Sequence, residues 1–254
     1  MNSSNSTIGT APDAATTRLF DHAIRNFGQG RARRVLDFGC GAGALVRGLE
    51  SAGYESYGCD FPGSMRGPTQ DRIREIRLSP GYELPFPDAS FDVIVSTGVL
   101  EHAQNKRECF SEMHRILKHD GFAVHLFPAK KFLPVEPHIH VPLANWFWPN
   151  CPNWWFAFWA LAGVRNDSQR AMRWREVAAS NVAYSASGLS YWATSAIERL
   201  AREIFGNCLW PTRFYLENAG GRYARWIGSL PLRGMWDFIS REFRYSFLVM
   251  RKTS

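Results

Sequence analysis

The sequence lacks any apolar run long enough to cross a membrane. Its longest, Trp154 to Val164, has 11 residues, well short of the roughly 20 that a membrane-spanning helix needs. Residues 1–12 are polar and have neither the basic start nor the apolar stretch of a signal peptide. We therefore predict a disordered lead-in over 1–12 and a cytoplasmic protein.

Paired cysteines are also missing. The five cysteines are odd in number and scattered, and none belongs to a CxxC pair. This pattern argues against a disulfide framework or a zinc site and favours a reducing compartment. It also gives no reason to predict a metal site, and none is predicted.

Tryptophan is absent from the first 145 residues, although the chain has ten, and net charge is absent from residues 1–164. All ten tryptophans lie between Trp146 and Trp236, and the net charge of +7 arises entirely within residues 165–254. The composition of the chain therefore changes near residue 128, from an alternating α/β half to an aromatic and basic half. The basic excess indicates either an anionic partner or a solvated arginine-rich surface.

Before residue 128, apolar and polar positions alternate as in an α/β protein. Helices are predicted at 14–27, 44–52 and 106–117, and strands at 34–38, 54–59, 73–78, 91–96 and 122–127. Short turns between alternating strands and helices predict a parallel, doubly wound sheet. Ligands bind such sheets at the carboxyl ends of the strands, so candidate site residues should follow each strand.

A glycine-rich turn follows the first of these strands. Its candidate cofactor contacts are Asp37, Gly39, Cys40, Gly41 and Gly43. Glycine permits close approach of a ligand to the backbone, and the next helix directs free N–H groups at it. A carboxylate here suits the cationic ammonium and sulfonium of S-adenosylmethionine, whereas it would repel a pyrophosphate. Asp60 ends the second strand and could bind the ribose hydroxyls of S-adenosylmethionine or of a nicotinamide dinucleotide. It therefore does not discriminate between these two cofactor classes.

Five segments in order give a family resemblance. Val35–Gly43, Tyr57–Asp60, Leu84–Ile94, Val99–His102 and Ile116–Gly121 resemble successive motifs of class I S-adenosylmethionine-dependent methyltransferases, in the quinone-biosynthesis-like branch. The likeness covers roughly residues 30–128, with Ser246 to Arg251 as a candidate last strand.

The resemblance implies a Rossmann-like sheet of seven strands, the last of them antiparallel. It implies that the glycine loop surrounds the methionine part of the cofactor, that Asp60 holds the ribose and that Phe61 packs against the adenine. Ser96, Thr97 and Gly98 would face the methionyl group, and Leu84 is a further candidate contact. Pro80 stands where the family often has an aspartate for the adenine amino group, so a backbone carbonyl is the expected substitute.

Methyl transfer needs alignment of acceptor and methyl group, and a hydroxyl acceptor also benefits from a general base. Candidate bases follow the fourth and fifth strands: His102, Glu136, His138 and His140. In an extended chain, Glu136 and both histidines would share one side. A structural loop, a general base and a three-ligand metal site all remain open for this run, and our working hypothesis assigns the base to His138 or His140.

Residues 129–190 are predicted to form an aromatic-rich helical insertion after the fifth strand, within a single domain of residues 13–254. Its eight aromatic residues between Trp146 and Trp159 and four nearby arginines fit an acceptor lid, a contact with a lipid surface or a partner, or self-packing helices. They suggest an amphiphilic, anionic acceptor. No nucleic-acid recognition motif accompanies the charge, so nucleic acid is not expected.

The predicted function is therefore methyl transfer from S-adenosylmethionine to a small-molecule, glycan or lipid acceptor, most simply on oxygen. Two alternatives stay open at this point. One is an NAD(P)-dependent oxidoreductase on the same fold, and the other is a non-catalytic binding module that keeps the cofactor fold.

Overall fold

The computed structural model describes residues 14–61, 73–75, 77–78, 82–219 and 221–253. Within them, a six-stranded sheet has the order β3-β2-β1-β6-β7-β8. Its strands are β1 (Arg34–Phe38), β2 (Glu55–Asp60), β3 (Ile73–Glu75), β6 (Phe91–Thr97), β7 (Leu117–Pro128) and β8 (Tyr245–Arg251). The expectations for residues 1–12 and Pro80 lie outside the described residues.

The strands pair in parallel except at one edge. β1 pairs with β2 and β6, β2 with β3, and β6 with β7, all in parallel register. β8 pairs antiparallel with β7 from Phe122↔Arg251 to Pro128↔Tyr245. The predicted antiparallel last strand is therefore confirmed, and the fold is α/β and Rossmann-like.

Two strand predictions need correction. The single strand expected at 73–78 is divided, because β3 joins the main sheet whereas β4 (Arg77–Leu78) pairs antiparallel with β5 (Tyr82–Glu83) in a separate sheet. The described residues consequently supply six strands to the main sheet, and the seventh is not found among them.

Alternating side chains of the strands build two cores, one on each face of the sheet. Val35, Val93 and Val95 pack with α1 (Ala14–Phe27) and α2 (Ala44–Ser51). Their neighbours Leu36 and Ile94 face the opposite core, which α3 (Lys106–Ile116) and α7 (Thr194–Phe205) cover. Each fully buried aliphatic side chain contributes about 1.5–3 kcal/mol to folding, so this period-two pattern fixes the register of the sheet.

Helix ends follow local signals. The α1 stripe of Leu19, Phe20, Ala23 and Ile24 is buried, as its spacing predicted. α2 begins after Gly43 in the left-handed conformation and ends one residue before its C-cap, Ala52. Together these elements place the glycine loop at the carboxyl end of β1, where the sequence predicted it.

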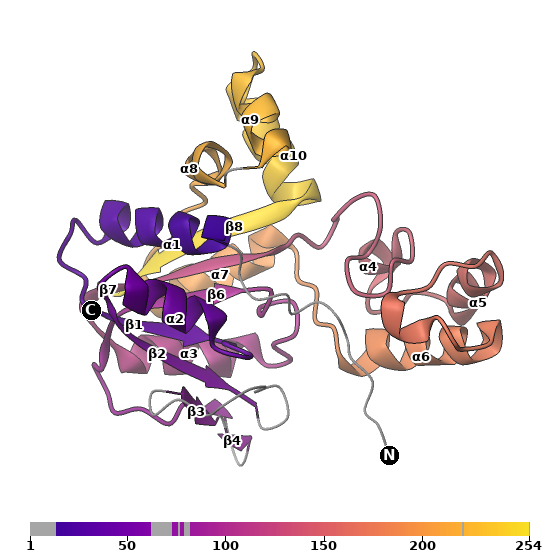
Figure 1. Ribbon diagram of the computed structural model, residues 1–254, viewed down its shortest axis with the longest axis horizontal. Coiled ribbons are helices and arrows are strands. Elements are labelled where there is room, and N and C mark those ends of the chain that lie inside the picture. The colour runs from indigo at the N-terminus through magenta and orange to yellow at the C-terminus, as the bar shows by residue number, and fades with distance from the viewer. Residues whose placement is uncertain (1–13, 62–72, 76, 79–81, 220, 254) are drawn as a thin grey trace.

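Residues 129–190 form a helical lobe beyond the carboxyl ends of the parallel strands (Figure 1). It contains α4 (Ala144–Phe147), α5 (Asn153–Leu161), a short 3₁₀ helix (Asp167–Gln169) and α6 (Trp174–Ser187). Two small cores lie within the lobe: Phe156 of α5 packs with Ile139 and Val141 in one, and Ala160 of α5 packs with Val177 of α6 in the other. The lobe's aromatic side chains therefore pack partly on one another.

Three further helices, which were not predicted, precede β8. They are α8 (Thr212–Asn218), α9 (Arg222–Ser229) and α10 (Arg233–Phe243), and they rise above the sheet in Figure 1. None of the helices in the described part of the chain has the length and apolarity to cross a bilayer.

Candidate functional site

The glycine loop is held tightly against the ends of β2 and β6. Gly39, Gly41 and Gly43 all have positive φ, which favours glycine over other residues. A methyl group on Gly39 would also lie 2.3 Å from Cγ2 of Val99. The loop therefore packs directly on the segment that leaves β6, and no side chain fits between them.

Asp37 ends its strand as a buried carboxylate. It is 3% exposed, and its Oδ1 atom has no hydrogen-bond partner among the described residues. Burial, and to a smaller extent the charge of Asp60, raises the pKa of Asp37 to about 8. Burying an uncompensated carboxylate is costly, so this position favours a cationic ligand group beside it.

Asp60 joins the second strand to the loop. Its Oδ2 accepts a hydrogen bond of 2.7 Å from the N–H of Gly41, and its Oδ1 accepts one of 2.7 Å from the N–H of Phe61. The side chain thus joins the end of β2 to the glycine loop.

The remaining predicted contacts fall into two groups. Gly98 follows β6 with φ 65°, beside half-buried Thr97, and its N–H donates to the carbonyl oxygen of Leu126 at 2.9 Å, so only its carbonyl could face a ligand. By contrast, the Ser96 hydroxyl is hydrogen-bonded to Nδ1 of His125 at 2.6 Å. The N–H of Leu84 donates to the carboxylate of Glu112, on α3, at 2.8 Å. Cys40 is buried, with its sulfur against Gly58.

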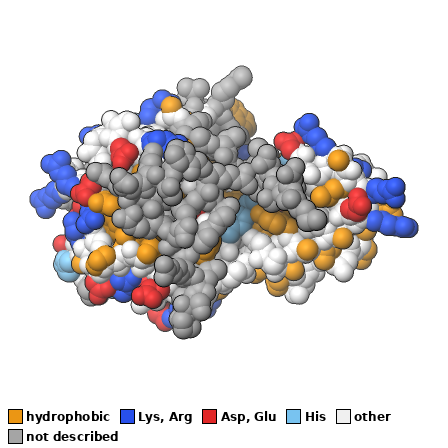
Figure 2. Space-filling model, turned by 60° about the horizontal axis from the view of Figure 1, so that its bottom comes forward, with side chains coloured by type: hydrophobic (Ala, Val, Ile, Leu, Met, Phe, Trp, Pro, Cys, Tyr) orange, Lys and Arg blue, Asp and Glu red, His pale blue; other side chains and the backbone are white. Residues whose placement is uncertain are grey.

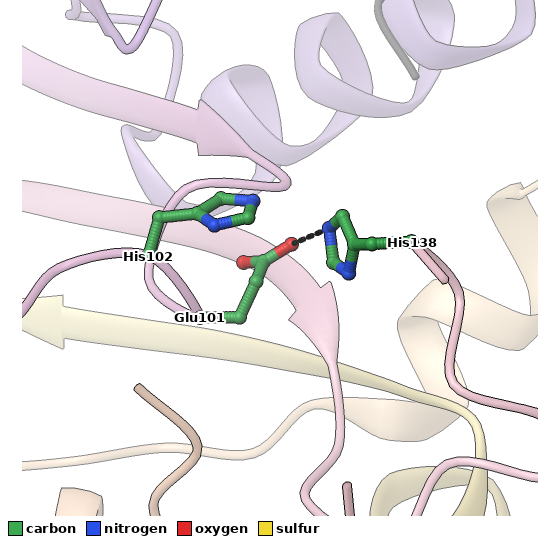
Figure 3. Close-up of side chains that lie close together, drawn as sticks. All are labelled: Glu101, His102 and His138. Carbon is green, nitrogen blue, oxygen red and sulfur yellow. Dashed lines mark ion pairs between the residues drawn. The ribbon is translucent and has the colours of Figure 1, made fainter. Parts of the chain in front are cut away.

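A cluster of polar side chains lies next to this loop. It comprises Glu101, His102 and His138, whose ligand-type atoms all lie within 4.8 Å of one another (Figure 3). Glu101 and His102 follow β6, and His138 comes from the chain after β7. The Cβ position of Gly98 is 3.5 Å from Oε1 of Glu101, so the cluster and the expected cofactor contacts share the same short turn.

Hydrogen bonds define the tautomers of both histidines. Nδ1 of His102 lies 2.6 Å from the carbonyl oxygen of Gly188, which only accepts, so this nitrogen carries the proton. Nδ1 of His138 lies 2.6 Å from Oε1 of Glu136. The Nε2 atoms of both rings are therefore left for the cluster, and that of His138 is 3.9 Å from Oε1 of Glu101.

Glu136 is a fully buried anchor for His138. Its oxygens accept bonds of 2.7 Å from the Tyr191 hydroxyl and from the N–H groups of His138 and Ile139. Burial alone would raise the pKa of Glu136. The hydrogen bond and charge of His138, together with the bonds from Tyr191 and Ile139, outweigh burial and hold the pKa of Glu136 below its usual value. The pKa of His138 is correspondingly raised, because Glu136 and Glu101 outweigh the effect of its burial.

The run from Glu136 to His140 is not extended, so the condition for both histidines to share one side with Glu136 is not met. The chain turns, since the N–H of His140 bonds the carbonyl of Glu136 at 2.9 Å and His140 has φ 60°. His138 consequently points into the cluster whereas His140 is exposed. Only one of the two histidines joins Glu136.

A buried lysine fastens the far side of the cluster. Nζ of Lys106 donates to the carbonyl of Ser190 at 2.5 Å and to its hydroxyl at 3.0 Å, and the N–H of Ser190 bonds the carbonyl of Glu101 at 2.6 Å. These bonds fix the strand-like connection that leaves α6. As a result, Tyr191 is brought to Glu136 across 55 positions of sequence.

Sequence reasoning did not assign Glu101, Tyr184 or Tyr191 to the site. Glu101 carried a usable signal, a single carboxylate among apolar residues directly after a buried strand. The two tyrosines carried none, because their place depends on how the helical lobe meets the sheet. The ring of Tyr184 lies 6.5 Å from that of His102 and 6.0 Å from that of His138.

Comparison with known proteins agrees with this geometry. A family described as "Methyltransferase domain" matches residues 36–125, which run from β1 through the glycine loop to β7. Over these residues the chain is similar to a methyltransferase domain. It is 29% identical over 124 residues to the ubiquinone/menaquinone biosynthesis C-methyltransferase UbiE of Citrifermentans bemidjiense, covering 44% of this chain and 53% of that protein.

Other relatives share the same domain but differ in named activity. The chain is 32% identical over 90 residues to the probable tRNA methyltransferase 9B of Mus musculus, covering 34% of this chain and 20% of that one. A solved structure of phosphoethanolamine N-methyltransferase 2 from Haemonchus contortus with S-adenosylmethionine aligns with TM-score 0.49 and 16% identity, over 92% of this chain and 52% of that chain. The chain thus spans between a fifth and about half of the length of these relatives, and the methyltransferase domain is what they share.

Proposed function

We propose that this chain transfers the methyl group of S-adenosylmethionine to a hydroxyl group of a small-molecule, glycan or lipid acceptor. The observation that carries the proposal is the buried pair Glu136–His138, which directs Nε2 of His138 toward the turn that also borders the glycine loop. An acceptor oxygen and a cofactor methyl group would meet there.

The cofactor half of the proposal rests on charge. Asp37 is buried, and no described residue bonds its Oδ1 atom; the ammonium of S-adenosylmethionine would supply the missing positive charge. Asp60 and the backbone of Gly98 would hold the ribose and the methionyl part. A dinucleotide would bring a pyrophosphate toward the same carboxylate, so the oxidoreductase alternative is not favoured.

The acceptor half rests on the cluster. In the transfer, the acceptor oxygen attacks the methyl carbon, the carbon–sulfur bond breaks and the sulfur keeps the electron pair. The hydroxyl proton must leave, and His138 is the side chain positioned to receive a hydrogen bond from it. General-base assistance of this kind contributes about 10²–10⁴-fold to rate.

We place acceptor recognition in the helical lobe. Trp154, Phe158 and Leu161 of α5 are 64%, 53% and 67% exposed, and the lobe shows hydrophobic side chains with basic ones at its outer edge (Figure 2). Such a surface suits an amphiphilic, anionic acceptor or a peripheral contact with lipid. None of the five cysteines, all of them in the described part of the chain, forms a disulfide bond, in keeping with the proposed cytoplasmic location.

The test is transfer of a labelled methyl group from S-adenosylmethionine to a panel of hydroxyl, amine and carbon acceptors. His138→Gln should lower turnover of a hydroxyl acceptor at least 100-fold. His140→Gln, two residues away on an exposed side chain, should stay within about twofold and serves as the matched control. Equal activity of the two variants would overturn the assignment to His138, and cofactor binding without turnover of any acceptor would favour a binding module.

A further inference from the structure

We propose that Glu101, His102 and His138 bind a divalent transition-metal ion. One oxygen and two ring nitrogens lie within 4.8 Å of one another, and in Figure 3 the carboxylate of Glu101 points between the two imidazoles. Two histidines and one carboxylate are a donor set of metal sites that keep open positions for water or substrate. The sequence left a metal site open only for the run Glu136, His138 and His140, and of these residues only His138 belongs to the cluster.

Both imidazoles have Nδ1 bonded outside the cluster. The Nδ1–H of His102 is donated to the carbonyl of Gly188, and that of His138 to the carboxylate of Glu136, each at 2.6 Å. Nε2 is therefore the ring atom that each histidine offers to a metal ion, which would bind it in the deprotonated form. Metal-bound histidines characteristically donate their other ring N–H to a carboxylate or backbone carbonyl, which fixes the ring and raises its basicity.

The carboxylate gives an independent indication. Glu101 is 3% exposed, and its Oε2 atom has no hydrogen-bond partner among the described residues. Its Oε1 atom is 3.9 Å from Nε2 of His138, too far for a hydrogen bond. A buried carboxylate oxygen without a donor is costly, and a cation between these three groups would satisfy Oε2.

The geometry also indicates which ions fit. Tetrahedral ligands at roughly 2.0–2.1 Å from Zn²⁺ are separated by about 3.4 Å, so the 3.9 Å gap between Glu101 and His138 needs to close by only about 0.5 Å. Two imidazoles favour Zn²⁺, Fe²⁺, Co²⁺ or Mn²⁺ over Mg²⁺ and Ca²⁺, which prefer oxygen ligands. The proposal is therefore specific to a transition metal.

The role of the ion, though not its binding, rests on the proposed function. Three protein ligands leave at least one position open, and an acceptor hydroxyl bound there would lose its proton more readily. His138 would then be a ligand of the ion and not the general base. The ion would lower the pKa of the bound hydroxyl and so promote loss of its proton. Because Gly98 adjoins Glu101, that oxygen would lie beside the cofactor.

The first experiment measures binding alone. The purified full chain is stripped with a chelator, then titrated with Co²⁺ by visible absorption and with Zn²⁺ by calorimetry against a competing chelator. One ion per chain is expected, with Mg²⁺ at least 100-fold weaker. His138→Gln and Glu101→Gln should each lose at least 100-fold in Zn²⁺ affinity, and Glu136→Gln, which removes only the outer partner, about 10–100-fold.

His140→Gln is the matched control and should bind as the unaltered chain does. Thermal unfolding of each variant shows whether it is folded, and Glu136→Gln keeps the test decisive should Glu101→Gln fail to fold. Absence of Co²⁺ and Zn²⁺ binding, or equal affinity in His138→Gln and His140→Gln, overturns the site.

A second experiment separates this proposal from the methyltransferase proposal. The same stripped protein is titrated with S-adenosylmethionine and assayed for methyl transfer before and after Zn²⁺ or Mn²⁺ is restored. Turnover that depends on the restored ion supports its role with the acceptor. Full turnover in the stripped protein overturns that role and leaves His138 as the base, and metal binding without cofactor binding overturns only the methyltransferase proposal.

Discussion

Asparagine in place of Asp37 should stabilise the cofactor-free chain while weakening its affinity for S-adenosylmethionine. Burial raises the pKa of this carboxyl from 3.8 to about 8 in the folded chain. The folded chain therefore holds a proton that the unfolded chain has released, and its stability falls as pH rises from about 4 to about 8. Asparagine has nearly the same shape and never ionises, so it removes this cost.

The size of the effect follows from the two pKa values. Linkage gives a cost of ionisable Asp37 of about 4 kcal/mol at pH 7 and about 1.7 kcal/mol at pH 5. These are upper values, since the chain relaxes around a buried charge. Urea unfolding at both pH values should show Asp37→Asn more stable than the unaltered chain, with the larger gain at pH 7.

Asp167→Asn is the matched control, because Asp167 is an exposed partner of Arg170 and its change should move stability by less than about 0.5 kcal/mol. Cofactor affinity should move the opposite way. Asp37→Asn should bind S-adenosylmethionine at least tenfold more weakly, yet bind 5′-methylthioadenosine, which lacks the ammonium, as before. A destabilised variant, or an equal gain at both pH values, would refute the reasoning about the buried charge.

Two further substitutions test the scaffold of the site. Gly39→Ala should lower the free energy of unfolding by at least 2 kcal/mol more than Gly53→Ala, because both residues have positive φ but only Gly39 meets another side chain, that of Val99; urea unfolding measures the difference, and equal losses would argue against the close packing. Asp92→Asn should cost about 1–3 kcal/mol at pH 7, since Asp92 accepts bonds from Lys118 and two backbone N–H groups. Burial raises the pKa of Asp92, but these bonds outweigh it and lower that pKa, so the difference between variant and unaltered chain should shrink as pH falls below 3.8. A pH-independent difference would contradict this.

The first half of the fold was predictable because its signals are local. Val35, Leu36 and Val93 sit in short apolar runs that end in turns, and such runs fix both strand and face. The glycine loop carries its own conformational signal in Gly39 and Gly41. The family resemblance then supplied the antiparallel last strand, which local pattern alone would have left without a partner.

The rest depended on contacts between distant segments. The turn at His140, which has positive φ, directs the His140 ring away from the cluster. No neighbouring glycine in the sequence indicates this turn. Tyr191 reaches Glu136 only because the connection after α6 is fastened by Lys106. Glu101 could have been predicted to be buried, because it follows a buried strand among apolar residues. Its grouping with His102 and His138 could not be predicted, because it depends on contacts between distant segments.

Calorimetric titration of the full chain with S-adenosylmethionine and S-adenosylhomocysteine tests the central claim most directly. Oxidised and reduced nicotinamide dinucleotides serve as control ligands, and Asp60→Asn serves as the site variant, because it keeps the volume of the side chain that bonds Gly41 and Phe61. The account predicts binding of both sulfur ligands at micromolar concentrations and at least tenfold weaker binding in the variant. Binding of a dinucleotide alone, or of none of these ligands, would contradict it.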